Sequence, residues 1–286
     1  MTNQIDVSYP APGYWRAEFC NPPINLIDMD TIAELSHLIS RLENDPDVKV
    51  IVFESRDPDF FLAHYDVLVD KARTAEMGRG PTGMHPWLDF LVRLSRAPVV
   101  SIASIRGRAR GAGSEFALAC DMRFASAEKA ILGQFEVGVG AVPGGNPMAR
   151  LAGLMGRGRA LEVVLCADDF PGVLAERYGY VNRAVSDAEL DDFVDLIARR
   201  IASFDKEAMV EAKRFIDDCS LPDDAAFPPA LEQFFVSVAR STTKARMMRL
   251  LTDGLQKRTD VELNLGRHVA ADAYLTTDDE LPFTSS

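Results

Sequence analysis

Hydrophobic residues recur along this chain with two different periods, one typical of helices and one typical of strands. Between residues 29 and 44 the apolar side chains lie three or four positions apart, which predicts an amphipathic helix. Residues 14–19 alternate in character, and residues 48–53 are mostly β-branched. Both of these patterns predict strands.

The middle of the chain repeats this alternation of strands and helices. Residues 98–105 are largely apolar, as expected of a strand buried on both faces, and residues 122–125 predict a further short strand. A helix is expected from about 112 to 119, directly after a glycine-containing turn. Strands that alternate with helices predict an α/β fold.

After Pro147 the pattern becomes mainly helical. The predicted helices span 147–155, 157–166, 171–178, 187–203, 206–217 and 228–255. We divide the chain into a core domain (1–221), a helical region (222–271) and an acidic, Ser/Thr-rich tail (272–286). The helical region could pack on a neighbouring subunit or cover its own core. Residues 71–87, which contain several glycines, predict a mobile loop.

Composition narrows the possible partners. The chain has 286 residues, 47% of them hydrophobic, and a net charge of −12. An acidic chain is a poor candidate for binding nucleic acid or an anionic membrane, because both require a positive surface. The four cysteines and four histidines are dispersed, so we expect no metal site. With no signal-like start and no long apolar run, a soluble cytoplasmic protein is expected.

Two glutamates, Glu115 and Glu136, lie in short glycine-marked segments about twenty residues apart. Glycine-rich turns allow backbone N–H groups to approach a ligand closely. Two carboxylates in one pocket can act as paired acid and base. Together these features suit proton transfer next to a carbonyl whose developing negative charge is stabilised by N–H groups.

The order of these motifs resembles the crotonase superfamily, which includes enoyl-CoA hydratases and isomerases. The resemblance extends from about residue 14 to 217, through segments at 50–53, 61–66, 98–102, 111–121, 133–145 and 155–162. It implies an α/β fold, a crotonase-like spiral of ββα units followed by a C-terminal helical oligomerisation region. It also implies a homotrimer or a dimer of trimers.

The resemblance further implies a reaction. In the hydratases of this family, two glutamates hold the attacking water and protonate the α-carbon. Here Glu115 would be the main base and Glu136 the acid. Backbone N–H groups at Tyr65 and Ala112 would form the oxyanion hole for a thioester carbonyl. The resemblance implies no metal and no redox cofactor, and coenzyme A would be carried as part of the acyl-CoA substrate.

Five further residues are expected to bind substrate: Ala63, His64, Trp87, Phe135 and Gly144. His64 departs from the family pattern, which has glycine at this position. Its side chain could crowd the contact with coenzyme A, add a base that titrates near neutrality, or pack outward beside the turn. One additional residue between Asp121 and Glu136 must also be absorbed for Glu136 to reach the site.

Other functions remain open at this stage. One is double-bond isomerisation, which needs the same enolate and one proton shuttle. Another is a specialised crotonase-fold hydrolase or tailoring enzyme that acts on a 1,3-dicarbonyl or other non-CoA substrate, for which His64 is the motivating residue. A third is a non-catalytic scaffold or partner subunit, against which the intact pair of glutamates argues.

Overall fold

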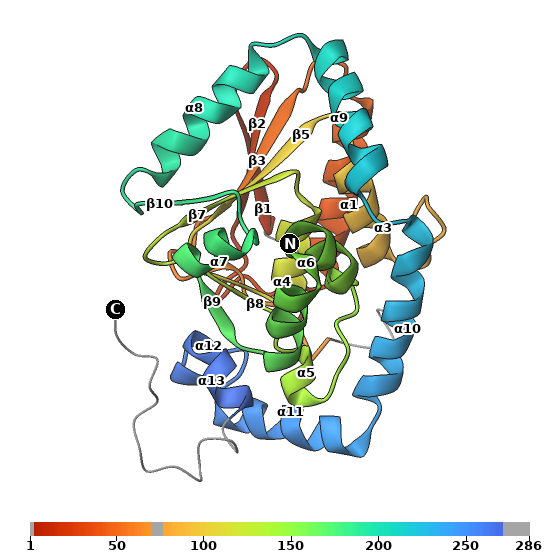
Figure 1. The fold of residues 1–286 in the computed structure, drawn as a ribbon, viewed down its shortest axis with the longest axis vertical. Coiled ribbons are helices and arrows are strands. Elements are labelled where there is room, and N and C mark those ends of the chain that lie inside the picture. The colour runs from red at the N-terminus through yellow and green to blue at the C-terminus, as the bar shows by residue number, and fades with distance from the viewer. Residues whose placement is uncertain (1–2, 70–76, 271–286) are drawn as a thin grey trace.

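The frame of the protein is a six-stranded sheet in the order β1-β2-β3-β5-β7-β10 (Figure 1). The structure is a computed structural model that describes residues 3–69 and 77–270. The strands are β1 (Ile5–Ala11), β2 (Tyr14–Phe19), β3 (Val50–Ser55), β5 (Val100–Ile105), β7 (Met122–Ser126) and β10 (Arg183–Val185). β1 and β2 are antiparallel, and the other neighbours are parallel. The predicted strands are confirmed: β2 matches at both ends, and no end of the others is shifted by more than two residues.

A second, smaller sheet positions the candidate site. Its strands are β4 (Phe60–Leu62), β6 (Arg108–Arg110), β8 (Ile131–Gly133) and β9 (Asp169–Pro171), in that order. β4, β6 and β8 are parallel, so their carboxyl ends meet at one edge. There the chain enters the turn at 63–66, the turn at Gly111 and the segment before Glu136. The sequence analysis missed these strands because three residues are too few to show a period.

Helices cover the sheets, and two of them start with clear local signals. α1 (Met29–Asn44) is capped by Asp28, whose side chain accepts a hydrogen bond from the Thr31 N–H. α3 (Pro86–Arg96) begins with proline at its first position, a favoured place for it. The expected loop at 71–87 is therefore wrong at its end, because Pro86 already starts this helix. Residues 71–76 of that loop lie outside the described residues.

The second half of the chain is mainly helical, as predicted, with only β9 and β10 as strands among its described residues. Its helices are α6 (Pro147–Cys166), α7 (Gly172–Tyr178), α8 (Leu190–Ala202), α9 (Lys206–Ser220), α10 (Phe227–Val238), α11 (Ser241–Asp253), α12 (Asp260–Leu263) and α13 (Leu265–Val269). Gly156, with φ of 77°, interrupts α6 where two helices were predicted. The single helix expected over 228–255 is wrong, since α10 and α11 are separate.

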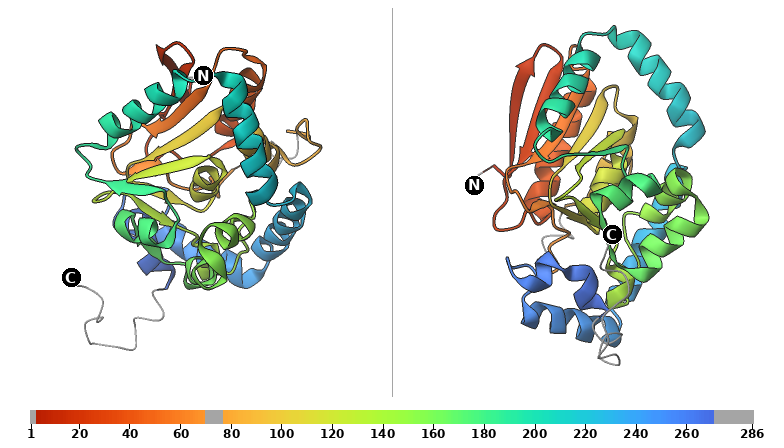
Figure 2. Two further views of the ribbon diagram at one scale, coloured as in Figure 1. Left: turned by 45° about the horizontal axis from the view of Figure 1, so that its top comes forward. Right: turned by 60° about the vertical axis from the view of Figure 1, so that its left-hand side comes forward.

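The C-terminal helices pack around the core that their own chain forms. α10 runs along one side of the molecule, and α11 lies against α5 (Glu136–Val139) (Figure 1). This path brings α13 into contact with β9 of the small sheet. The turned views show the blue C-terminal helices lying against the rest of the molecule (Figure 2). The predicted boundary at residue 221 directly follows α9. The predicted tail at 272–286 lies outside the described residues.

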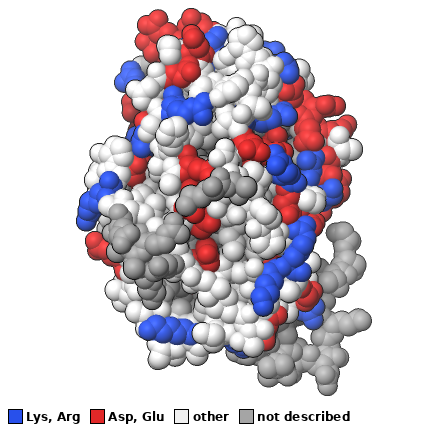
Figure 3. Space-filling view, turned by 180° about the vertical axis from the view of Figure 1, so that it is seen from behind, with Lys and Arg blue, Asp and Glu red and all other residues white. Residues whose placement is uncertain are grey.

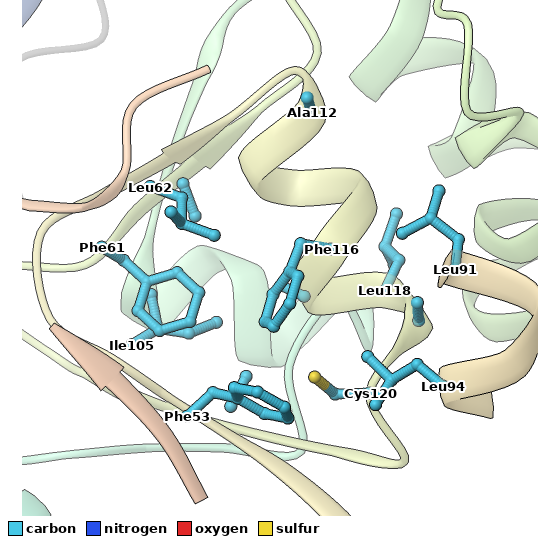
Figure 4. Close-up of a cluster of buried hydrophobic side chains, with 14 of the residues drawn as sticks. Phe53, Phe61, Leu62, Leu91, Leu94, Ile105, Ala112, Phe116, Leu118 and Cys120 are labelled. Carbon is cyan, nitrogen blue, oxygen red and sulfur yellow. The ribbon is translucent and has the colours of Figure 1, made fainter. Parts of the chain in front are cut away.

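A single buried helix, α4 (Ala112–Ala119), lies at the centre of the core. All eight of its residues are buried, and the Phe116 ring lies 5.0 Å from that of Phe53 (Figure 4). A Cβ atom at Gly113 would lie 2.0 Å from the carbonyl oxygen of Leu62. Only glycine therefore allows α4 to pack this closely on β4. Such packing fixes the start of α4, where Glu115 is located.

Candidate active site

Glu115 lies in the first turn of α4 and is 3% exposed. Its Oε2 accepts a 2.8 Å hydrogen bond from the indole N–H of Trp87, and its Oε1 accepts one of 2.8 Å from the Gly145 N–H. Burial raises the pKa of Glu115, while these two donors and the charge of Arg150 oppose that increase. The site thus supplies this carboxylate with specific support for its ionised form.

Glu136 has a different environment. It is the first residue of α5 and is 8% exposed, and its buried Oε2 has no hydrogen-bond partner among the described residues. Burial and the negative charge of Glu115 together raise the pKa of Glu136 to about 8. Glu136 therefore holds a proton at neutral pH. Two carboxyl groups whose environments separate their pKa values can take the two roles of base and acid.

The geometry at Gly111 shows where the Glu136 side chain points. A Cβ atom on Gly111 would lie 2.6 Å from Oε1 of Glu136, so the carboxyl group reaches the residue that precedes α4. Gly111 also has φ of 49°, a conformation that side chains rarely adopt. The additional residue before Glu136 therefore does not direct its side chain away from α4.

The two segments with the predicted oxyanion donors lie side by side. The Arg110 N–H donates to the carbonyl oxygen of Ala63 (3.2 Å), which places the start of α4 beside the turn that contains Tyr65. Ala112 is the first residue of α4, where backbone N–H groups have no acceptor within the helix. The Tyr65 turn is held from its other side by Ile27 through a parallel β-bridge.

His64 is buried with both ring nitrogens engaged. Nδ1 lies 2.8 Å from the carbonyl oxygen of Tyr65, and Nε2 lies 3.2 Å from the carboxylate of Glu262 in α12. Burial opposes protonation of the ring, but the charge and hydrogen bond of Glu262 and the Tyr65 carbonyl outweigh it and raise the pKa of His64. Both partners of the ring are hydrogen-bond acceptors, so both ring nitrogens must carry a proton, and His64 is in the imidazolium form. This geometry favours packing away from the glutamate pair over action as a base.

The other predicted substrate-binding residues line the same region. Trp87 stacks on Phe90 with 6.1 Å between ring centroids, besides donating to Glu115. Gly144 packs against α10, since a Cβ atom there would lie 3.1 Å from Leu231 and 3.2 Å from Phe234. Phe135 is buried against α11 and α13, and Ala63 is fully buried. Their contacts with a ligand stay a prediction.

Three residues around the candidate site were given no role by the sequence analysis. The N–H of Gly145, the residue after the predicted substrate-binding Gly144, donates to Glu115. Arg150 is buried one helical turn into α6, with its guanidinium 5.1 Å from the Phe227 ring. Glu262 approaches His64 from 198 residues away. No local pattern marks a pairing over such a separation.

The surface charge, the possible metal ligands and the helix lengths show which kinds of partner the described residues could bind. Acidic and basic side chains are interspersed on the face drawn in Figure 3, and the basic ones form no continuous patch there. Within residues 3–69 and 77–270, no group of three or more His, Cys, Asp or Glu side chains is arranged to hold a metal ion. In the same ranges, no helix has the length and apolar character needed to cross a membrane.

The two packed sheets, the central α4 and the C-terminal helices define a crotonase-fold protein with a buried pair of glutamates. The family model described as enoyl-CoA hydratase/isomerase matches residues 16–252, and the chain belongs to this family. This membership makes it an enzyme of the hydratase/isomerase type and confirms the family that the sequence motifs indicated.

Individual relatives agree with this assignment. The chain is 31% identical to the short-chain-enoyl-CoA hydratase of Clostridium acetobutylicum over 71% of its own length and 78% of the relative's. It is 33% identical to the crotonyl-CoA hydratase of Syntrophomonas wolfei over 63% and 68%. A crystal structure of a candidate enoyl-CoA hydratase from Streptomyces avermitilis superposes with a TM-score of 0.89, at 42% identity and over 96% and 98% of the two chains.

Proposed function

We propose that this enzyme adds water to, or removes it from, the α,β double bond of an acyl-CoA thioester. The observation that carries the proposal is the unequal pair of buried glutamates. Glu115 accepts two hydrogen bonds, whereas Glu136 has a pKa of about 8 and holds a proton at neutral pH. Hydration needs one base and one acid at the same time, and this pair supplies both.

The chemistry follows from those two states. The Glu115 carboxylate takes a proton from water as the water oxygen bonds to the β-carbon. The electron pair of the double bond moves onto the thioester oxygen, where the N–H groups of Tyr65 and Ala112 stabilise the enolate. The Glu136 carboxyl then donates its proton to the α-carbon, and the carbonyl reforms. Removal of one such oxyanion donor typically costs about 3 kcal/mol of transition-state stabilisation.

The test is hydration of a panel of enoyl-CoA esters, from short aliphatic to aromatic, followed by absorbance of the conjugated thioester. Glu115→Gln and Glu136→Gln are expected to lower kcat by roughly 10²–10⁴, the usual contribution of a general acid or base. An isomerase would move the double bond without incorporating water, which mass spectrometry in H₂¹⁸O distinguishes. Hydration that both variants perform at the wild-type rate would contradict the proposal.

The oligomeric state belongs to the same proposal. A homotrimer or a dimer of trimers is supported by apolar side chains that the single chain leaves exposed on its outer helices. They are Leu154, Leu165, Phe215, Ile216, Phe235, Val236 and Met248. Light scattering coupled to gel filtration would measure the mass directly, and a monomer at micromolar concentration would contradict this part. The cytoplasmic location stays a prediction from the sequence.

A further inference from the structure

We propose that the buried His64–Glu262 pair is a positioning device that holds the Tyr65 turn against the C-terminal helix α12. Given the proposed function, it keeps the Tyr65 N–H aligned with the thioester oxygen. His64 and Glu262 are positioning residues in this scheme, since neither reaches the reacting atoms. The inference rests on four sets of contacts around the turn.

The first set fixes the histidine end. The imidazole spans from the Tyr65 carbonyl oxygen (2.8 Å) to the Glu262 carboxylate (3.2 Å). His64 is 1% exposed and Glu262 is fully buried, so water does not screen the attraction. An ion pair of this kind is costly to break on one side, because the remaining charge stays buried without compensation.

The second set fixes the glutamate end. The Gln256 N–H donates to Oε2 of Glu262 (2.8 Å). The carbonyl oxygen of Glu262 accepts a 2.7 Å hydrogen bond from Arg110, which also forms two hydrogen bonds of 2.6 and 2.7 Å to the Asp169 carboxylate. Arg110 and Asp169 lie on β6 and β9 of the small sheet. Glu262 is therefore fastened to the sheet whose carboxyl edge carries the site.

The third and fourth sets surround Tyr65 itself. The Gln256 side chain donates to Oδ1 of Asp66 (2.6 Å), so the segment 256–262 holds the residues on both sides of Tyr65. From the opposite side, Ile27 accepts from the Asp66 N–H and donates to the His64 carbonyl oxygen, both at 2.9 Å. A backbone held at three consecutive residues has little freedom to rotate its central N–H.

The same contacts connect two distant parts of the chain. Glu262 follows α11, while the turn it holds lies in the first quarter of the sequence. The correct docking of the C-terminal helices thus becomes a condition for an ordered oxyanion donor. The glycine that the family resemblance implies at this position has no side chain, so it could not connect Tyr65 to α12 as the His64 ring does.

The test is Glu262→Gln, with Asp260→Asn as the matched control on the same helix. Asp260 lies at the surface, where its carboxylate is 2.8 Å from His268, so its neutralisation leaves the turn alone. Four quantities are measured in each protein: kcat, KM, the infrared carbonyl stretch of a bound ¹³C-labelled thioester, and amide hydrogen exchange of peptides covering 60–68. Exchange in α1 is the internal reference.

Glu262→Gln is expected to lower kcat at least tenfold with KM changed less than threefold. It is also expected to return the bound carbonyl stretch toward its value in solution and to accelerate exchange at 60–68 but not in α1. Asp260→Asn is expected to match the wild type. A lower melting temperature with kcat, carbonyl stretch and local exchange all unchanged would show a purely structural pair and overturn the inference.

Two further arms keep the result decisive. If Glu262→Gln fails to fold, the double variant His64→Gln/Glu262→Gln removes both buried charges together, and the same four quantities are read there. If the wild type turns over no enoyl-CoA ester, the proposed function fails separately. Amide exchange at 60–68 then still tests whether the His64–Glu262 pair holds the Tyr65 turn. Faster exchange in Glu262→Gln would support this role, and unchanged exchange would reject it.

Discussion

The indole N–H of Trp87 donates a 2.8 Å hydrogen bond to Oε2 of Glu115, so a side chain from α3 fixes the carboxylate at the start of α4. The Gly145 N–H holds the other oxygen, whereas the buried Oε2 of Glu136 has no such partner among the described residues. This difference in hydrogen bonding separates the two glutamates chemically and is the basis of the predictions that follow.

Replacement of Trp87 by phenylalanine removes the donor and keeps an aromatic ring. A hydrogen bond to a charged group contributes about 1.5–3 kcal/mol, so we expect kcat to fall roughly ten- to hundredfold. The measurement is steady-state hydration at neutral pH. Trp15→Phe is the matched control, because Trp15 lies on β2 and packs against Tyr9. Equal losses of activity in both variants would contradict a specific role for Trp87.

Gly145→Ala tests whether the turn before α6 positions Glu115. The new Cβ atom would lie 2.2 Å from Oε2 of Glu115, so the carboxylate must move or the turn must shift. We expect a loss of kcat of roughly 10² or more, comparable to the loss of a general base. Gly153→Ala, in the helix α6 that follows this turn, places its Cβ atom where no other atom lies within 4 Å and serves as the control. Wild-type kcat in Gly145→Ala would refute this positioning.

The pH dependence of hydration follows from the two protonation states. Activity requires ionised Glu115 and protonated Glu136, so kcat is expected to rise as Glu115 loses its proton and to fall above about pH 8, where Glu136 loses its own. The two limbs belong to the coupled pair rather than to either residue alone. A rate that stays constant from pH 7 to 10 would show that Glu136 is not the acid.

The raised pKa of Glu136 also makes the folding stability of the protein depend on pH. Because its pKa is raised on folding, the folded state binds more protons than the unfolded state between the ordinary glutamate range and about pH 8. The contribution of Glu136 to stability is therefore complete at low pH and declines as pH rises through that window. In thermal melts, the melting temperature of Glu136→Gln relative to that of the wild type should rise from pH 5 to pH 9. A constant difference in melting temperature would argue against the raised pKa.

Arg150 provides an electrostatic test of Glu115. Burial raises the pKa of Glu115, and the positive charge of Arg150 is one of the groups that oppose this increase. Arg150→Met should therefore shift the low-pH limb of the rate profile to higher pH, while Arg150→Lys keeps the charge and should leave the limb nearer its original position. Identical low-pH limbs in the wild type and Arg150→Met would exclude this coupling.

Local sequence patterns predicted most of the larger helices and strands, and they also identified the two glutamates of the candidate site. The helices over 29–44 and 112–119 match the structure to the residue, because periodicity and a preceding turn or cap mark their ends. The two glutamates stood out because each follows glycines that permit close backbone approach. The strands of the small sheet carried no such signal, since each has only three residues and is stabilised by pairing with distant segments. Phe60 of β4, for example, pairs with Arg108 of β6.

The sequence by itself determined the α/β class, the family and the two carboxylates, because each depends on residue types at short spacing. Tertiary structure alone decided which carboxylate is supported in its ionised form, since Trp87 and Gly145 reach Glu115 from separate elements. It also decided that the His64 side chain meets Glu262 instead of the glutamate pair. Burial and long-range pairing set these protonation states, and neither property is encoded in any local stretch of the chain.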